Sequence, residues 1–369
     1  MAMTDRPQSP TADEGIAAVT AEGHTYKSAL QRLQYVQIAA PAPGHAVLVA
    51  QGVWWGRIPL PLDLDHINVW LLETADGYVV VDTGMASDAG KEAWQQIETQ
   101  LCSRMPLCAV LVTHIHPDHL GLAAWLQQRH DIPVVMSKRT HEQAVALLAD
   151  TSGIDMAAEL RAFLRRYGVA ESQSGRGLFS PQRFARMVSG LPDVSRYLGD
   201  DETLPWNSDI WTALETNGHA EGHLCLNDCA HRLLISGDQV LPAISPNIGL
   251  GWRNQDLNPL GSYLSSLERL RRLDRDTLVL PSHGEPFYGL RDRIDDLRNH
   301  HLQQLENIVV ACHLPQAVVD ILPIMFRRVL KGMHFLLALA EALAHLEYLV
   351  HESRLRRVTD DAGVVRYVA

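Results

Sequence analysis

The segment VTHIHPDHLG, residues 112–121, constrains the fold most, because it places three histidines and one aspartate between positions 114 and 119. It follows a short apolar run that is typical of a buried strand and precedes a helical pattern. Side chains of an extended loop alternate with a period of two, so His114 and His116 project the same way and can bind one metal ion. The adjacent pair Asp118 and His119 suits a second ion beside the first.

Three later segments offer further ligands, and each stands at the end of a strand-like run. They are TNGHAEGH with His219, ISGDQV with Asp238, and LPSHGEP with His283. Residues at strand ends are presented to a cleft by a rigid scaffold. The sequence therefore predicts a site for two metal ions, about 3.5–4 Å apart, that share an activated hydroxide.

Each of these pieces also has an ordinary structural explanation when it is taken alone. A short histidine pattern on a loop is commonly surface polarity, and Asp82 in VVVDTG could merely cap a turn. Cys225 and Cys229 have a spacing that could suit zinc, but they stand in alternating strand-like sequence, which favours core packing. The remaining histidines on helical stretches are expected at the surface or in the core.

Taken together and in this order, the motifs H-x-H-x-D-H, G-H, G-D and S-H-G resemble the metallo-β-lactamase superfamily, in particular its glyoxalase II-like hydrolases, over roughly residues 45–312. The resemblance implies an α/β fold, an αββα sandwich of the metallo-β-lactamase type. It implies that Asp82 supports the site from behind, and that His223 is less suited as a ligand than His219. The implied ligands are His114, His116 and His219 for the first metal, Asp118, His119 and His283 for the second, and Asp238 as the bridge.

Five imidazoles and two carboxylates suit two Zn²⁺ ions, with iron or manganese as alternatives. Oxidative members of the family carry an acidic residue where His116 stands, so the resemblance implies hydrolysis. An aspartate at position 238, in place of cysteine, fits the thioesterase, lactonase and phosphodiesterase branches. The expected reaction is attack of the bridging hydroxide on an ester, thioester or lactone carbonyl of a small molecule, with Asp118 or Asp238 passing a proton to the leaving group.

The chain divides into three parts by pattern. Residues 1–30 are weakly patterned and predicted to be a flexible segment, residues 31–312 form the hydrolase domain, and residues 138–200 within it are predicted to be a helical cap insertion. Residues 313–369 read as helix, helix and hairpin, which is the order of a winged-helix-like module. The residues expected either to line a substrate pocket or simply to pack the cap are Phe163, Phe179, Phe184, Met187 and Tyr197, with Trp54 and Trp55 at the other rim.

Charge and composition restrict the partners. The net charge of −11 argues against broad binding of nucleic acid or of an anionic membrane. Five scattered cysteines favour a reduced, cytoplasmic protein, and the polar N-terminus predicts no secretory signal. The apolar stretch 333–350 is interrupted by Glu341, His345 and Glu347, which predicts an amphipathic helix and no membrane span.

Two rival functions stay open at this point. A winged-helix-like tail with slightly basic composition could serve a metal-dependent phosphodiesterase or nuclease that acts on nucleic acid. The chain could also be a non-catalytic binding protein that has kept its metals. The apolar residues of the tail could alternatively support a homodimer.

Overall fold

The fold is seen in a computed structural model, which describes residues 32–62, 64–149, 154–170, 181–204, 211–254, 257–327 and 329–369. The segment 1–30, predicted to be flexible, and Phe179 lie outside these described residues.

A first sheet of seven strands has the order β2-β3-β4-β5-β6-β7-β8. Its strands β5, β6 and β7 pair in parallel and are almost entirely buried. This burial explains why their sequences are short apolar runs without alternation. The strands are β2 (Ala46–Ala50), β3 (Val53–Pro59), β4 (His66–Glu73), β5 (Tyr78–Val81), β6 (Leu107–Leu111), β7 (Val134–Met136) and β8 (Val194–Tyr197).

A second sheet of six strands has the order β1-β13-β12-β11-β10-β9. Strands β9, β10 and β11 pair antiparallel, and β11 pairs with β12 in parallel. The strands are β1 (Gln34–Tyr35), β9 (Trp211–Thr216), β10 (His223–Asp228), β11 (Leu233–Gly237), β12 (Leu278–Pro281) and β13 (Phe287–Tyr288).

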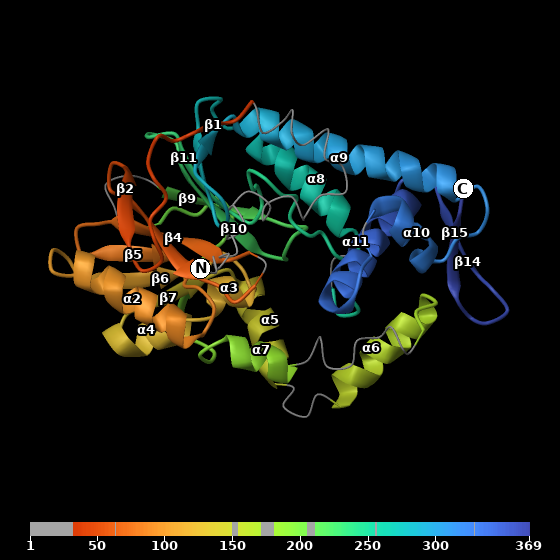
Figure 1. Cartoon of the computed structure of the whole chain (residues 1–369), viewed down its shortest axis with the longest axis horizontal. Helices are drawn as coiled ribbons and strands as arrows, with labels where there is room; N and C mark the ends of the chain where they lie inside the picture. Colours follow the sequence, from red (N-terminus) through yellow and green to blue (C-terminus); the bar gives the residue numbers. More distant parts are fainter. Residues whose placement is uncertain are drawn as a thin grey trace, which may run out of the picture.

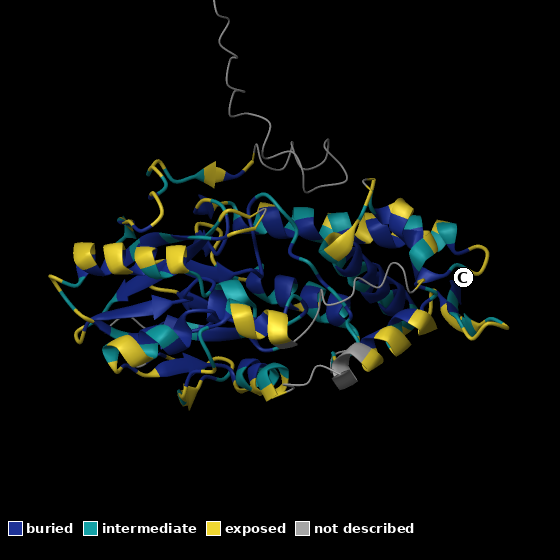
Figure 2. Cartoon of the chain, turned by 60° about the horizontal axis from the view of Figure 1, so that its bottom comes forward, coloured by how far each residue is buried: buried dark blue, intermediate teal, exposed yellow. Residues whose placement is uncertain are grey.

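The two sheets face each other between two layers of helices, which confirms the expected αββα sandwich. One core cluster lies between the sheets and contains Trp55 and Trp70, whose rings stack 6.2 Å apart. A second cluster joins the outer face of the first sheet to α2 (Asp88–Leu101) and α4 (Ala123–His130). A third cluster joins the second sheet to α8 (Pro259–Leu270) and α9 (Leu290–Ala311). Figure 1 shows these helices on opposite sides of the sheets, and Figure 2 shows buried strands with exposed residues on the outer helices.

The stretch 138–200 is not a single helical cap. Helices α5 (Lys138–Ala149) and α7 (Pro181–Met187) contact each other near the first sheet, and residues 194–197 form the edge strand β8 on β7. Helix α6 (Ile154–Arg166) packs instead against the C-terminal part of the chain, in the same core cluster as α11 (Gly332–His351). The last strand differs from the helical prediction because backbone pairing with β7 outweighs local pattern.

The C-terminal part continues from α9 with two helices and a hairpin, as the sequence predicts. These elements are α10 (Val318–Met325), α11, β14 (Arg356–Thr359) and β15 (Val365–Val368). By length and composition α11 is the one helix among the described residues that could cross a membrane, but 61% of its apolar window is buried inside the protein. Burial of that kind is typical of a core helix.

Candidate metal centre

The first group of potential ligands converges after strand β6. The Nε2 atom of His114 lies 2.9 Å from Nδ1 of His116, and Nε2 of His219 lies 3.1 Å from the same Nδ1 atom. His219 comes from the turn between β9 and β10, more than a hundred positions along the chain. With Asp238 these residues form a group whose ligand atoms all lie within 4.8 Å of one another.

The second group lies beside the first and comprises Asp118, His119 and His283. Asp118 and His119 belong to a single helical turn, α3 (Pro117–Leu120), and not to the extended loop assumed from the sequence. The Oδ2 atom of Asp118 lies 3.6 Å from Nε2 of His119 and 3.3 Å from Nε2 of His283. Pro117 explains the difference, because proline at the first helical position starts a helix readily.

The Asp238 carboxylate lies between the two groups. Its Oδ2 atom is 3.3 Å from Nε2 of His219, and its Oδ1 atom is 3.5 Å from Nε2 of His119 and 3.6 Å from Nε2 of His283. One oxygen therefore faces each group. The structure thus brings all seven predicted ligand residues together, with Asp238 in the position expected of a bridge.

Backbone carbonyls fix the orientation of two of the imidazoles. Nδ1–H of His219 donates to the carbonyl of Asn247 at 3.0 Å, and Nδ1–H of His283 donates to the carbonyl of His66 at 2.9 Å. A proton held on Nδ1 leaves the Nε2 lone pair directed into the site. Partners of this kind are typical of metal-binding histidines.

Asp82 lies behind His114 and His119, at the position where the resemblance implied a supporting role. Its Oδ1 atom accepts the backbone N–H of Thr113 at 2.8 Å, and its Oδ2 atom accepts from Nδ1 of His119 at 2.8 Å. The Thr113 hydroxyl donates to the same carboxylate and lies 3.0 Å from Nδ1 of His114, from which it can accept. Asp82 has a φ of 61°, an uncommon backbone conformation that aspartate tolerates better than most residues.

His223 lies outside both groups and has a different role, which sequence reasoning missed. Its Nε2 atom accepts the backbone N–H of Asp238 at 3.2 Å, while Nδ1 lies 3.0 Å from the hydroxyl of Thr216. A Cβ atom at Gly237 would lie 2.4 Å from the His223 ring, so only glycine fits between them. The signal in the sequence was a histidine at an inward position of a fully buried strand.

Charges in the site are strongly coupled. Burial, together with His219, lowers the pKa of His116 to about 3. Burial alone would raise the pKa of Asp118, but the neighbouring His119 and His283 lower it to about 2. Burial disfavours the charged form of the His119 and His283 rings, yet the adjacent carboxylates outweigh this effect and raise the pKa of both rings. The carboxylates of Asp118 and Asp238 are therefore ionised at neutral pH, and their negative charge favours a nearby cation.

The residues present fit metal ions. Nε2 of His119 and Oδ1 of Asp238 are buried and have no hydrogen-bond partner among the described residues. Leaving such a group unsatisfied costs about 1–3 kcal/mol, and a cation between the two atoms would satisfy both. Imidazole and carboxylate ligands of this number suit zinc.

The described members of the aromatic and apolar set expected at a substrate pocket lie in different parts of the fold. Phe163 packs against the C-terminal core cluster, whereas Phe184 and Met187 pack against the cluster of the first sheet. Tyr197 is 45% exposed, and Trp55 is fully buried between the sheets. The alternative explanation, that such residues pack the insertion onto the core, describes Phe163, Phe184 and Met187.

Comparison with known proteins agrees with this geometry. The family described as the Metallo-beta-lactamase superfamily matches residues 62–283, which is more than half of the chain. A second family, described as Metallo-beta-lactamase-like, C-terminal domain, matches residues 305–369. The chain belongs to the metallo-beta-lactamase superfamily and is a metallo-hydrolase of that fold.

Individual proteins are similar to this chain in sequence or in structure. The crystal structure of a beta-lactamase domain protein from Burkholderia ambifaria is 37% identical, with a TM-score of 0.80, covering 92% of this chain and all of that one. A probable metallo-hydrolase of Bacillus subtilis is 25% identical over 81% of this chain and 92% of its own length. An acyl-coenzyme A thioesterase of Gallus gallus is 25% identical over 65% of this chain and 80% of its own length.

Proposed function

We propose that this protein is a dinuclear metal-dependent hydrolase that cleaves an ester, thioester or lactone carbonyl of a small molecule. The observation that carries the proposal is the Asp238 carboxylate, whose two oxygens face two separate groups of ligand atoms. A site for one ion would need only one of these groups. Two Zn²⁺ ions are the proposed occupants, with iron or manganese as alternatives.

Ions bound in the two groups would supply a hydroxide at neutral pH and polarise the substrate carbonyl. The chain's own contribution is to hold the ligands in place. Hydrogen bonds at Nδ1 direct the lone pairs of His219 and His283 inward, and Asp82 does the same for His119. Ligands held in this way need no reorganisation during the reaction.

Proton transfer to the leaving group is assigned to Asp118 or Asp238. The side chain of Asp118 is 16% exposed and that of Asp238 is 10% exposed, so both are largely withdrawn from water. A carboxylate in such a position can carry a proton between two reacting groups. Asp118 is the more accessible of the two and is the first candidate.

Among the carbonyl substrates, a thioester is the class to test first. The support is the thioesterase of Gallus gallus, which aligns with this chain over most of its own length. Identity of 25% leaves the acyl group open.

The nucleic-acid alternative has less support from the C-terminal module. Arg354 pairs with Glu306, and Arg357 pairs with Glu347. Both guanidinium groups therefore already have a carboxylate partner with which a nucleic-acid phosphate would have to compete. Arg366 likewise lies 2.7 Å from the carboxylate of Asp360. A homodimer through this module and a cytoplasmic location stay predictions.

The test uses purified protein loaded with zinc and a panel of p-nitrophenyl esters, acyl-coenzyme A thioesters, lactones and bis-p-nitrophenyl phosphate. We expect turnover of a carbonyl substrate that is lost in His116→Ala and Asp118→Ala, whereas His313→Ala, at an exposed position just beyond the C-terminal end of α9, keeps it. Cleavage of the phosphodiester alone would favour the nuclease. Metal-loaded protein that cleaves nothing would favour a binding protein, and variants that keep both metals and rate would refute the assignment.

A further inference from the structure

A single residue, Asn247, connects the C-terminal module to the proposed metal centre. Its backbone carbonyl accepts Nδ1–H of His219 at 3.0 Å. Its side-chain amide donates to Oε2 of Glu341 at 3.0 Å and to the carbonyl of Leu337 at 3.3 Å, both on α11. The contact that orients a proposed ligand is therefore anchored on a helix 94 positions further along the chain.

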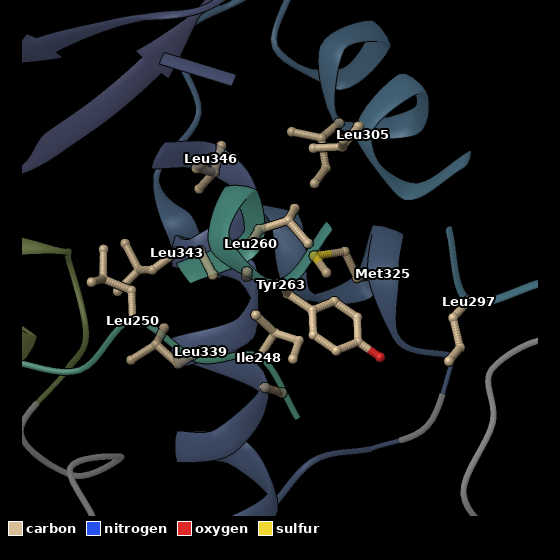
Figure 3. Packing of buried hydrophobic residues seen from close by; sticks show 14 of the residues in the cluster. Ile248, Leu250, Leu260, Tyr263, Leu297, Leu305, Met325, Leu339, Leu343 and Leu346 are labelled. Atoms are coloured by element: carbon tan, nitrogen blue, oxygen red, sulfur yellow. The ribbon is translucent and has the colours of Figure 1, made fainter. Parts of the chain in front are cut away.

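The loop around Asn247 lies directly on α11. The backbone N–H of Leu250 donates to the carbonyl of Ala340 at 2.9 Å. A Cβ atom at Gly249 would lie 3.0 Å from that of Ala340, so the loop approaches the helix closely. Ile248 and Leu250 pack among Leu339 and its neighbours on the helix (Figure 3). The position of the Asn247 carbonyl is thus set by α11.

Glu341 is an unusual residue for this interface. Among the described residues, its only side-chain hydrogen bond is the one from Asn247. Burial raises the pKa of Glu341 to about 7, which the Asn247 hydrogen bond only partly counteracts. Glu341 is partly buried in the structure, and withdrawing a carboxyl group from water costs stability unless its contacts offset the lost hydration. The feature that singles out Glu341 is its position, because its carboxylate accepts the hydrogen bond that holds the Asn247 side chain against α11.

We propose that Glu341 is a positioning residue that acts through Asn247 on His219, and that the C-terminal module is therefore part of the metal centre. Glu341 holds the Asn247 side chain against α11, and this fixes the plane of the carbonyl that accepts the hydrogen bond from Nδ1–H of His219. Loss of that contact would let the loop turn, and the His219 lone pair would no longer point at the first group. The inference rests on the proposed function, because it assumes that the first group binds a metal ion.

The two groups should differ in their dependence on α11. His219 belongs to the first group, with His114, His116 and Asp238. In the second group, His283 is held by the carbonyl of His66, which belongs to the first sheet. A change at Glu341 should therefore weaken one of two metal-binding steps and leave the other unchanged.

The experiment titrates metal-free, full-length protein with Zn²⁺ in competition with a chelator, and with Co²⁺ while visible absorption is recorded. For Glu341→Ala we expect one binding step to weaken by about tenfold, as for other residues that orient metal ligands, and the Co²⁺ spectrum to change. Glu341→Gln should bind nearly as the wild type does, because its amide oxygen can still accept from Asn247. Asn247→Ala should match Glu341→Ala, and the double variant should be no weaker than either single one.

Leu349→Ala is the matched control. Leu349 is fully buried on the same helix, in the same core cluster, and has no hydrogen bond to the loop of Asn247. This variant should lower the unfolding temperature while leaving both binding steps unchanged. Equal weakening in Leu349→Ala, or wild-type affinity in Glu341→Ala, would overturn the positioning role alone. Wild-type protein that binds no second ion, or none at all, would overturn the proposed function as well.

Discussion

Replacement of Asp82 by asparagine is expected to lower the affinity of the second group for its metal ion while the local backbone conformation is kept. Asp82 has a φ of 61°, and asparagine tolerates this conformation as aspartate does. The change converts one carboxylate oxygen into an NH₂ group and removes the negative charge. Both oxygens are engaged, one by the backbone N–H of Thr113 and the other by Nδ1 of His119.

Either orientation of the new amide breaks one of these hydrogen bonds. If the NH₂ group faces His119, the ring must place its proton on Nε2, where it points at the position of the ion. If the NH₂ group faces Thr113, a buried backbone donor loses its acceptor. A hydrogen bond to a charged group contributes about 1.5–3 kcal/mol. Since about 1.4 kcal/mol corresponds to a factor of ten, the expected loss of affinity is about 10- to 100-fold.

The assay is chelator competition with Zn²⁺ on metal-free protein, with circular dichroism to verify that the variant is folded. Asp76→Asn, at an exposed turn between β4 and β5, serves as the control and should bind both ions as the wild type does. If folded Asp82→Asn also keeps wild-type affinity for both ions, then Asp82 does not orient His119 in the way described.

Three further outcomes are expected. Burial lowers the pKa of His345 to about 4, so the folded protein resists a proton that the unfolded chain takes up below pH of about 6.5. Stability should be complete above that pH and fall by up to about 1.4 kcal/mol per unit as the pH drops towards 4, with a smaller fall in His345→Gln by denaturant unfolding. Asn68 donates to two backbone carbonyls that bracket His283, so Asn68→Ala should lose one of two ions on dialysis; retention of both would contradict this. Gly237→Ala should lower the free energy of unfolding by at least about 1 kcal/mol, because alanine is strained at the φ of 52° found at position 237 and the new Cβ atom would collide with His223. An unchanged thermal unfolding transition would speak against this close contact.

Much of the candidate site could be predicted because its residues follow strands. His114 comes after β6, Asp238 directly after β11 and His283 soon after β12, and such ends meet at one edge of the sandwich. The layered fold and the family were predicted for the same reason, since buried strands and the order of motifs leave few alternatives. That these residues bind metal stays a prediction.

Contacts between distant side chains could not be predicted. Nothing in the sequence pairs Asn247 with Glu341, because neither residue belongs to a motif and the contact depends on how α11 packs. The atom that each ring presents was also hidden, since His116 turns Nδ1 towards the first group while His219 turns Nε2. Rotamers of this kind are decided by packing and not by spacing.

Placement of α6 was missed for a related reason. Its amphipathic pattern shows that one face is buried, but not against what. Tyr167, which follows this helix, packs in the cluster that contains Tyr367 of the terminal hairpin, and Gly168 lies close to Val364. The helix thus belongs with the end of the chain and not with the segments that flank it.

Helix α9 connects the two segments of the chain that the family models match. The first family match ends at residue 283, and the second begins at residue 305. Helix α9 (Leu290–Ala311) begins between the two matches and continues into the second. One face of this helix buries Ile294 in the same cluster that takes in Leu305 and the core of α11. A chain cut at the family boundary would expose that shared apolar surface to water. The two segments that the family models match therefore share one hydrophobic core cluster.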